Sequence, residues 1–173
     1  MVDNTLKLSF LENGIDQVAL VVESVDKAVE EYWNTLGVGP WAIFTFSKPV
    51  LKHAIYRGEE VDYSHRVAFG QMGGLRIELI ETIQGPTIYE DFARENGYGM
   101  HHIGVLVDDM EAAQAEAKAA GFQVIQEGYG FGISGDGHYA YLDTDKVMGM
   151  VVELIHVPSK RGAPESIYPA PAE

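Results

Sequence analysis

The stretch that decides the fold is MHHIGVLV at residues 100–107, which has a counterpart in IDQVALVV at residues 15–22. Both are typical of apolar strands, and both run into a helical pattern. A second pair matches GLRIELI at residues 74–80 with GMVVELI at residues 149–155, and in each run a glutamate follows a glycine by four positions. The repeat predicts two similar units packed together as one domain.

The two matched pairs are not equally spaced along the chain. The first pair is offset by 85 positions and the second by 75, so the first half is 10 residues longer internally. Both matched strands of each half belong to the repeated unit, so the extra residues fall between them. We expect this excess to form a loop between matched strands.

Helix signals lie at the same place in each half. Ser24 is a favourable N-cap for a first helix, and Asp108 with a glutamate three residues later predicts the start of a second. A capping box at residue 87 predicts a short linker helix that ends before Gly97. After residue 157 the chain is rich in Pro, Ala and Ser, which predicts a loosely held tail. The predicted single domain, residues 1–173, therefore contains modules at 10–83 and 98–157, a linker helix at 87–96 and a tail at 158–173.

Composition excludes several functional classes. The net charge of −14 disfavours nucleic-acid binding, and no apolar run is long enough to span a membrane. The absence of cysteine excludes disulfides and thiol catalysis and fits a cytoplasmic protein. Basic residues gather in one stretch, which is either a solvated loop or an anchor for an anionic substrate. These residues are Lys48, Lys52, Arg57, Arg66 and Arg76.

Polar residues occur among apolar neighbours on single faces of the predicted strands. Because strand side chains alternate between faces, Glu153 lies with Val151 and Ile155, and Gln17 and His102 have similar surroundings. A buried glutamate without a partner is costly, so something must neutralise it. A bound cation is one candidate. The same alternation turns His101 to the face opposite His102, where packing or a surface hydrogen bond is expected.

With these features, the chain resembles the vicinal oxygen chelate superfamily, which includes glyoxalase I, methylmalonyl-CoA epimerase, extradiol dioxygenases and antibiotic-resistance binding proteins. The resemblance covers about residues 10–157. Within it, GYGMHHIG at residues 97–104 and GMVVEL at residues 149–154 are similar to methylmalonyl-CoA epimerases. The resemblance implies an α+β fold of two βαβββ modules that form an open, curled β-sheet funnel with a metal inside.

The resemblance places the four metal-ligand positions on Gln17, Glu78, His102 and Glu153, a set similar to that of glyoxalase I. These oxygen and nitrogen donors suit one divalent ion, namely Zn, Co, Ni, Mn or Mg. Gln17 stands where epimerases and dioxygenases have histidine, so a site that has lost its metal is the alternative. An iron dioxygenase is disfavoured because such sites need two histidines and a carboxylate.

The resemblance also implies a metal-dependent isomerase or epimerase that acts on an enolisable carbonyl or acyl-thioester substrate. In such an enzyme the metal stabilises an enediolate or enolate, and Glu153 and Glu78 are the catalytic bases. The separate catalytic glutamate of the epimerases has no match around residues 64–69. Two alternatives stay open, a glyoxalase I-type lyase for a thiol hemithioacetal and a metal-free small-molecule binding protein.

The expected partners are a small-molecule substrate and a second copy of the chain in a homodimer, without nucleic acid or membrane. The residues expected to contact the substrate are Arg66, His65, His138 and Tyr141.

Overall fold

The computed structural model describes residues 8–12 and 14–171. Its first half contains β1 (Gln17–Val21), α1 (Val25–Leu36), β2 (Trp41–Phe46), β3 (His53–Tyr56), β4 (Glu59–Glu60), β5 (Ser64–Met72) and β6 (Leu75–Gln84). The second half contains α2 (Ile88–Asn96), β7 (Gly99–Leu106), α3 (Met110–Ala119), β8 (Val124–Phe131), β9 (Gly137–Leu142), α4 (Asp145–Met148) and β10 (Val151–His156). A 3-10 turn, Ser9–Leu11, precedes β1, and β11 (Ser166–Tyr168) follows β10. No helix within the described ranges is long and apolar enough to cross a membrane.

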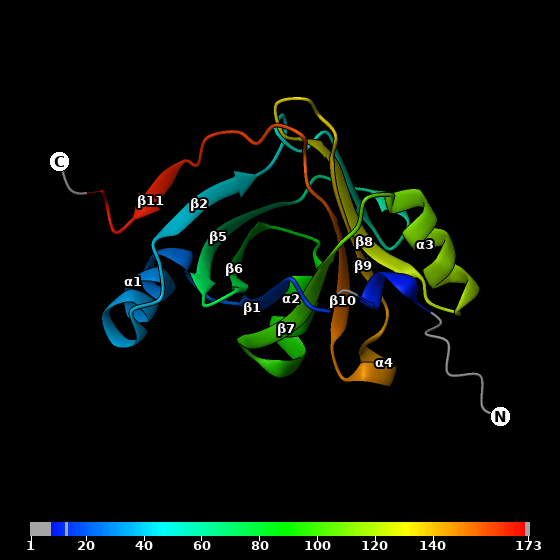
Figure 1. Cartoon of the computed structure of the whole chain (residues 1–173), viewed down its shortest axis with the longest axis horizontal. Helices are drawn as coiled ribbons and strands as arrows, with labels where there is room; N and C mark the ends of the chain where they lie inside the picture. Colours follow the sequence, from blue (N-terminus) through cyan, green and yellow to red (C-terminus); the bar gives the residue numbers. More distant parts are fainter. Residues whose placement is uncertain (1–7, 13, 172–173) are drawn as a thin grey trace.

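All the strands form one curled sheet in the order β11-β2-β5-β6-β1-β7-β10-β9-β8-β3-β4 (Figure 1). At its centre β1 runs antiparallel to β7, and each of these strands has a parallel partner, β6 and β10 respectively. The order β1-β6-β5-β2 in the first half therefore repeats as β7-β10-β9-β8 in the second. The predicted α+β architecture with an open, curled sheet is confirmed.

The helices α1 and α3 cover the outer face of the two arms of the sheet (Figure 1). Ser24 caps α1 as predicted, and its side chain accepts a hydrogen bond from the amide of Lys27 at 3.4 Å. The cap of α3 is Asp109 rather than Asp108, one residue later than expected. The Asp109 carboxylate accepts from the amide of Ala112 at 3.0 Å, which satisfies a free N–H of the first turn.

The extra residues of the first half lie between β2 and β5, but they form a hairpin instead of the expected loop. Its strands, β3 and β4, pair with each other, and β3 also pairs antiparallel with β8 of the second half. Ala54 lies opposite Gly128 in this pairing. The hairpin thus joins the far ends of the two arms, and the first half completes the sheet of the second.

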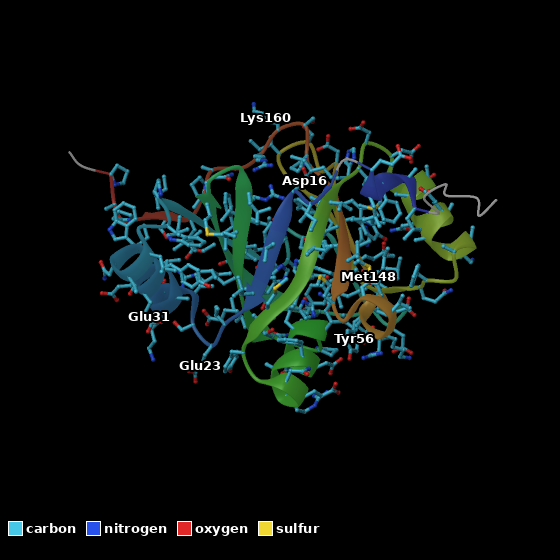
Figure 2. All side chains as sticks on the ribbon, turned by 60° about the horizontal axis from the view of Figure 1, so that its bottom comes forward. Asp16, Glu23, Glu31, Tyr56, Met148 and Lys160 are labelled. Carbon is cyan, nitrogen blue, oxygen red and sulfur yellow. The ribbon has the colours of Figure 1, made fainter. Side chains whose placement is uncertain are left out.

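The C-terminal residues are held more firmly than the predicted tail. β11 pairs antiparallel with β2, with Ile167 opposite Ala42, and so becomes an edge strand. We call residues 157–165 the crossing segment, because it runs from β10 across to β2. The amide of Ile133 donates to the carbonyl of Lys160 at 2.9 Å, and the amide of Glu165 donates to that of Ile43 at 2.8 Å. Figure 2 shows Lys160 toward the same end of the sheet as Asp16, which precedes β1.

Candidate metal centre

Four polar side chains meet on the concave face of the sheet, one from each of its four central strands. Gln17 comes from β1, Glu78 from β6, His102 from β7 and Glu153 from β10, and none is more than 5 % exposed. One ligand atom each from Glu78, His102 and Glu153 lie within 4.8 Å of one another. The convergence that the resemblance implies is therefore seen for these three residues.

The carboxylates and the imidazole face a common point. The His102 Nε2 atom lies 3.2 Å from Glu153 Oε2 and 3.4 Å from Glu78 Oε2. This nitrogen is buried and makes no hydrogen bond of acceptable geometry. Two carboxylate oxygens and a free ring nitrogen are a donor set that suits a divalent cation. Glu78, His102 and Glu153 therefore fit the metal that the fold implies.

Burial and neighbouring charges shift the pKa values of the cluster residues. Burial raises the pKa of Glu78, because the charged carboxylate is removed from water. Burial alone would lower the pKa of His102, but the nearby negative charges of Glu153 and Glu78 outweigh it and raise the pKa to about 9. A cation at this point would take the place of the proton that the histidine otherwise holds.

Gln17 is oriented by Arg76. The amide oxygen of Gln17 accepts a hydrogen bond from Arg76 Nε at 2.7 Å. Its amide nitrogen consequently faces the carboxylates, and it donates to Glu78 Oε2 at 2.7 Å and to Glu153 Oε2 at 2.9 Å. Because arginine has only donors, turning the amide would place N–H groups against N–H groups. This orientation makes Gln17 a donor to both carboxylates, which departs from the expected fourth metal ligand.

A β-bulge brings His101 beside the cluster. In the pairing of β1 with β7, Ala19 lies opposite His102 and Leu20 lies opposite Met100, so His101 is the extra residue. His101 is buried, and its Nδ1 lies 2.9 Å from Nδ1 of His102. This contact orients the His102 ring with Nε2 toward the carboxylates. The expected opposite face was wrong, because the alternation of faces breaks at a bulge, but His101 does pack, against the rings of Tyr89 and Phe92.

A cavity of about 670 Å³ opens on the cluster, and Gln17, Glu78 and Glu153 form part of its wall. Much of the remaining wall is aromatic. Its aromatic lining consists of Phe44, Phe46, Phe69, Phe131, Tyr139 and Tyr141. Such a chamber, apolar with a few converging polar groups, is typical of a small-molecule site.

Residues 16–141 match the family model of the Glyoxalase/Bleomycin resistance protein/Dioxygenase superfamily. The chain belongs to this superfamily. The match covers most of both βαβββ halves and includes Gln17, Glu78 and His102, while Glu153 lies beyond it.

Individual members of the superfamily are only distantly similar. The uncharacterized protein YqjC of Bacillus subtilis is 25% identical over 82% of this chain and 91% of its own length. Human mitochondrial methylmalonyl-CoA epimerase is 26% identical over 81% of this chain and 72% of its own length. A variant of Streptomyces coelicolor methylmalonyl-CoA epimerase in complex with 2-nitronate-propionyl-CoA has a TM-score of 0.58 and 21% identity, covering 84% of this chain and 97% of that one.

Two of the four predicted substrate contacts line the cavity. Tyr141 lies opposite Glu153 on the neighbouring strand β9, and it accepts a hydrogen bond from Tyr89 of α2 at 2.7 Å. His65 on β5 is buried, and its ring stacks on Phe46 with 5.3 Å between centroids. Burial lowers the pKa of His65 to about 3, so the ring is neutral at physiological pH.

The other two predicted contacts face away from the cavity. Arg66 follows His65 in β5, so it lies on the opposite face, where it forms an ion pair with Asp26 at 2.7 Å. His138 precedes Tyr139 in β9 and is bonded to Glu127 at 2.9 Å on the outer side. Neither residue lines the cavity, because strand alternation turns both side chains to the outer face of the sheet.

The basic residues of the first half divide into two groups. Lys48, Arg57 and Arg66 form ion pairs with aspartates, whereas Lys52 and Arg76 line the cavity. Arg161 of the crossing segment also lines it and was not foreseen. It lies in the region predicted as a tail, and no local signal there indicates a contact with the site.

Proposed function

We propose that this chain is a metal-dependent enzyme that moves a proton at the carbon next to a carbonyl group, in an isomerase or epimerase reaction. The observation that carries the proposal is the buried group of Glu78, His102 and Glu153, whose two carboxylates form part of the wall of the cavity. The relatives that are methylmalonyl-CoA epimerases support the same reaction type.

The residues of the cluster would serve two roles, metal binding and proton transfer. Glu78, His102 and Glu153 would hold a divalent cation, which when bound polarises a carbonyl oxygen and makes the adjacent C–H more acidic. Glu153 on β10 and Glu78 on β6 reach the cluster from opposite sides of β1 and β7. One carboxylate removes a proton from the substrate carbon, and the other returns a proton to its opposite face.

The surroundings keep these carboxylates in place. Gln17 donates one N–H group to each carboxylate, and the aromatic wall provides an apolar surface beside them. A thioester is the first substrate class to test, because a relative of this fold is described with 2-nitronate-propionyl-CoA. Methylmalonyl-CoA, named in the relatives, is the first compound of that class.

The experiment is solvent-deuterium incorporation into methylmalonyl-CoA and other 2-substituted acyl thioesters, with metal content measured on the same samples. Glu153→Gln and Glu78→Gln should each retain the fold and lose exchange by roughly 100- to 10,000-fold, because an amide cannot accept the proton. Glu95→Gln, which removes an exposed carboxylate of α2, is the matched control and should exchange normally.

The two variants also separate mechanisms. Equal loss in both, with metal retained, supports two-base chemistry and an epimerase. Loss in Glu153→Gln alone indicates a single base and contradicts two-base chemistry. Full exchange in metal-loaded Glu153→Gln would assign the proton transfer to another residue of the cavity, such as His65, and would contradict the proposed role. A protein that binds no metal on titration would favour a binding protein.

A further inference from the structure

The arginines of this chain fall into two sets by their partners. Arg57 and Arg94 both form ion pairs with Asp91, and Arg66 pairs with Asp26. In the part of the chain that the structure describes, no carboxylate lies within 4.0 Å of the guanidinium groups of the other two. These two are Arg76 and Arg161, and both line the cavity. Unpaired arginines are unexpected in a chain with 26 acidic and 12 basic residues.

Arg76 lies on the cavity wall next to the metal centre. Its Nε donates a hydrogen bond to the amide oxygen of Gln17, and its guanidinium carbon lies 5.2 Å from the centroid of the Phe69 ring. The terminal Nη groups make no hydrogen bond to any described residue. The backbone pairing of β1 with β6 places Arg76 directly opposite Gln17, and the contacts with Gln17 and Phe69 hold the guanidinium at the cavity wall.

Arg161, an exposed residue of the crossing segment, lines the same cavity. Partial burial and the positive charge of Arg76 both lower the pKa of Arg161, which reflects the proximity of two like charges. The nearby Glu165 accepts a hydrogen bond from Thr45 at 2.8 Å and is not paired with either arginine. Lys52 adds a third cation to the wall.

We propose that Arg76 and Arg161 form an anion subsite, which takes a carboxylate of the substrate beside the reacting centre. The planar fork of a guanidinium matches a carboxylate through two parallel hydrogen bonds. The aromatic wall, including Phe44 and Phe69, takes an apolar body attached to it. This inference rests on the proposed function, and it narrows the substrate to a carboxylate-bearing, enolisable carbonyl compound with an apolar body.

The test compares probes of one shape and different charge by calorimetric titration of the zinc-loaded protein. The probes are 3-phenylpropionate, its uncharged match 3-phenylpropanamide, and phenyl phosphate as a second anion. Wild type should bind the carboxylate about tenfold or more tightly than the amide, as expected for hydrogen bonds to charged groups. The preference should fall to below about threefold in Arg76→Met and in Arg161→Met. Arg94→Met, which removes a guanidinium outside the cavity, should keep it.

Three results would overturn the subsite. They are equal binding of acid and amide by wild type, an unchanged preference in both cavity variants, and tighter binding of phenyl phosphate than of the carboxylate. Arg161 is exposed, so Arg161→Met still tests the subsite if Arg76→Met does not fold. If wild type shows Glu153-dependent deuterium exchange but no preference for the carboxylate probe over the amide, the subsite is contradicted and the proposed function is still supported. If the preference depends on the two arginines but no exchange occurs, the subsite is supported and the proposed function is contradicted.

Discussion

Arg76 links the metal centre to the rest of the cavity. It fixes the amide of Gln17 through Nε, and its positive charge lies one side chain away from the two carboxylates. We therefore expect Arg76→Met to bind zinc more tightly than wild type, on the order of tenfold. Two causes act in the same direction, because the amide becomes free to offer its oxygen and a nearby positive charge is lost.

The measurement is a competition titration of zinc against a chromophoric chelator at constant ionic strength. Arg94→Met controls for the loss of one positive charge from the molecule. Weaker zinc binding by a correctly folded Arg76→Met would mean that Arg76 supports the ligand geometry, and the orientation argument for Gln17 would fail.

Burial of His65 should lower the free energy of unfolding at acidic pH. Its pKa is lowered from 6.5 to about 3 by burial, and its Nδ1 has no hydrogen-bond partner. The unfolded chain therefore takes up the proton more readily, so the stability present above pH 6.5 is lost as the pH falls toward 3. Between pH 7 and pH 5 this amounts to about 2 kcal/mol.

The variant His65→Phe keeps an aromatic ring in contact with Phe46 and cannot take up a proton. Urea unfolding at pH 7 and pH 5 should show a decline in the free energy of unfolding that is smaller than in wild type by the same amount. Carboxylates contribute equally to both proteins and cancel in the comparison. Parallel declines in the two proteins would show that His65 is not kept neutral by the fold.

At the scale of elements, α2 supports the site from below the arch of the sheet (Figure 1). Its Tyr89 donates to Tyr141 at the cavity wall and packs edge-on against His101. The helix begins at Thr87, whose buried hydroxyl accepts from the amide of Glu90 at 3.1 Å, as the capping box predicts. A stable α2 therefore holds Tyr89 in place against the rings of Tyr141 and His101.

We expect Thr87→Ala to lower the free energy of unfolding by about 1–2 kcal/mol, because a buried capping bond is lost. Ser24→Ala removes the exposed and longer 3.4 Å cap of α1, and it should lower the free energy of unfolding by only about 0.5 kcal/mol. Urea unfolding with an unchanged m-value is the measurement. Equal costs at the two caps would contradict the argument from burial.

Strand alternation explains which parts of the site could be predicted from the sequence. The repeat aligned the four central strands, and the period of two placed Glu153, Gln17 and His102 each among apolar neighbours on one face of its own strand. That these residues and Glu78 meet at one site was implied by the resemblance to the vicinal oxygen chelate superfamily. His101 could not be placed in this way, because its bulge is visible only in the pairing with β1.

The hairpin of β3 and β4 could not be predicted from strand signals. β4 contains only Glu59 and Glu60, and its existence depends on β3 pairing with a strand of the other half. Arg161 depends likewise on the path of the crossing segment, which long-range contacts to Ile43 and Ile133 decide. Local sequence carries no information about either.

At the scale of the whole molecule, the C-terminal segment closes the cavity without carrying the core. The buried core clusters consist of residues up to Leu154, with Tyr168 packed on one of them. A chain ending at Val157 should therefore fold. Its free energy of unfolding should be lower by on the order of 2 kcal/mol, from the lost strand hydrogen bonds of β11.

This truncated chain should also lose the preference for 3-phenylpropionate over its amide, because Arg161 is absent. Circular dichroism, urea unfolding and the same calorimetric titration are the measurements. A truncated chain that keeps the preference would show that Arg76 alone reads the charge.

During synthesis, the β3–β4 hairpin emerges from the ribosome well before β8, the strand with which it pairs. β3 is complete at Tyr56, but its partner β8 begins only at Val124. At ribosomal rates of about 5–20 residues per second, the hairpin spends on the order of 10 s with one edge unpaired. Open strand edges invite association between nascent chains, and the charges of Glu59, Glu60 and Arg57 on this hairpin oppose it.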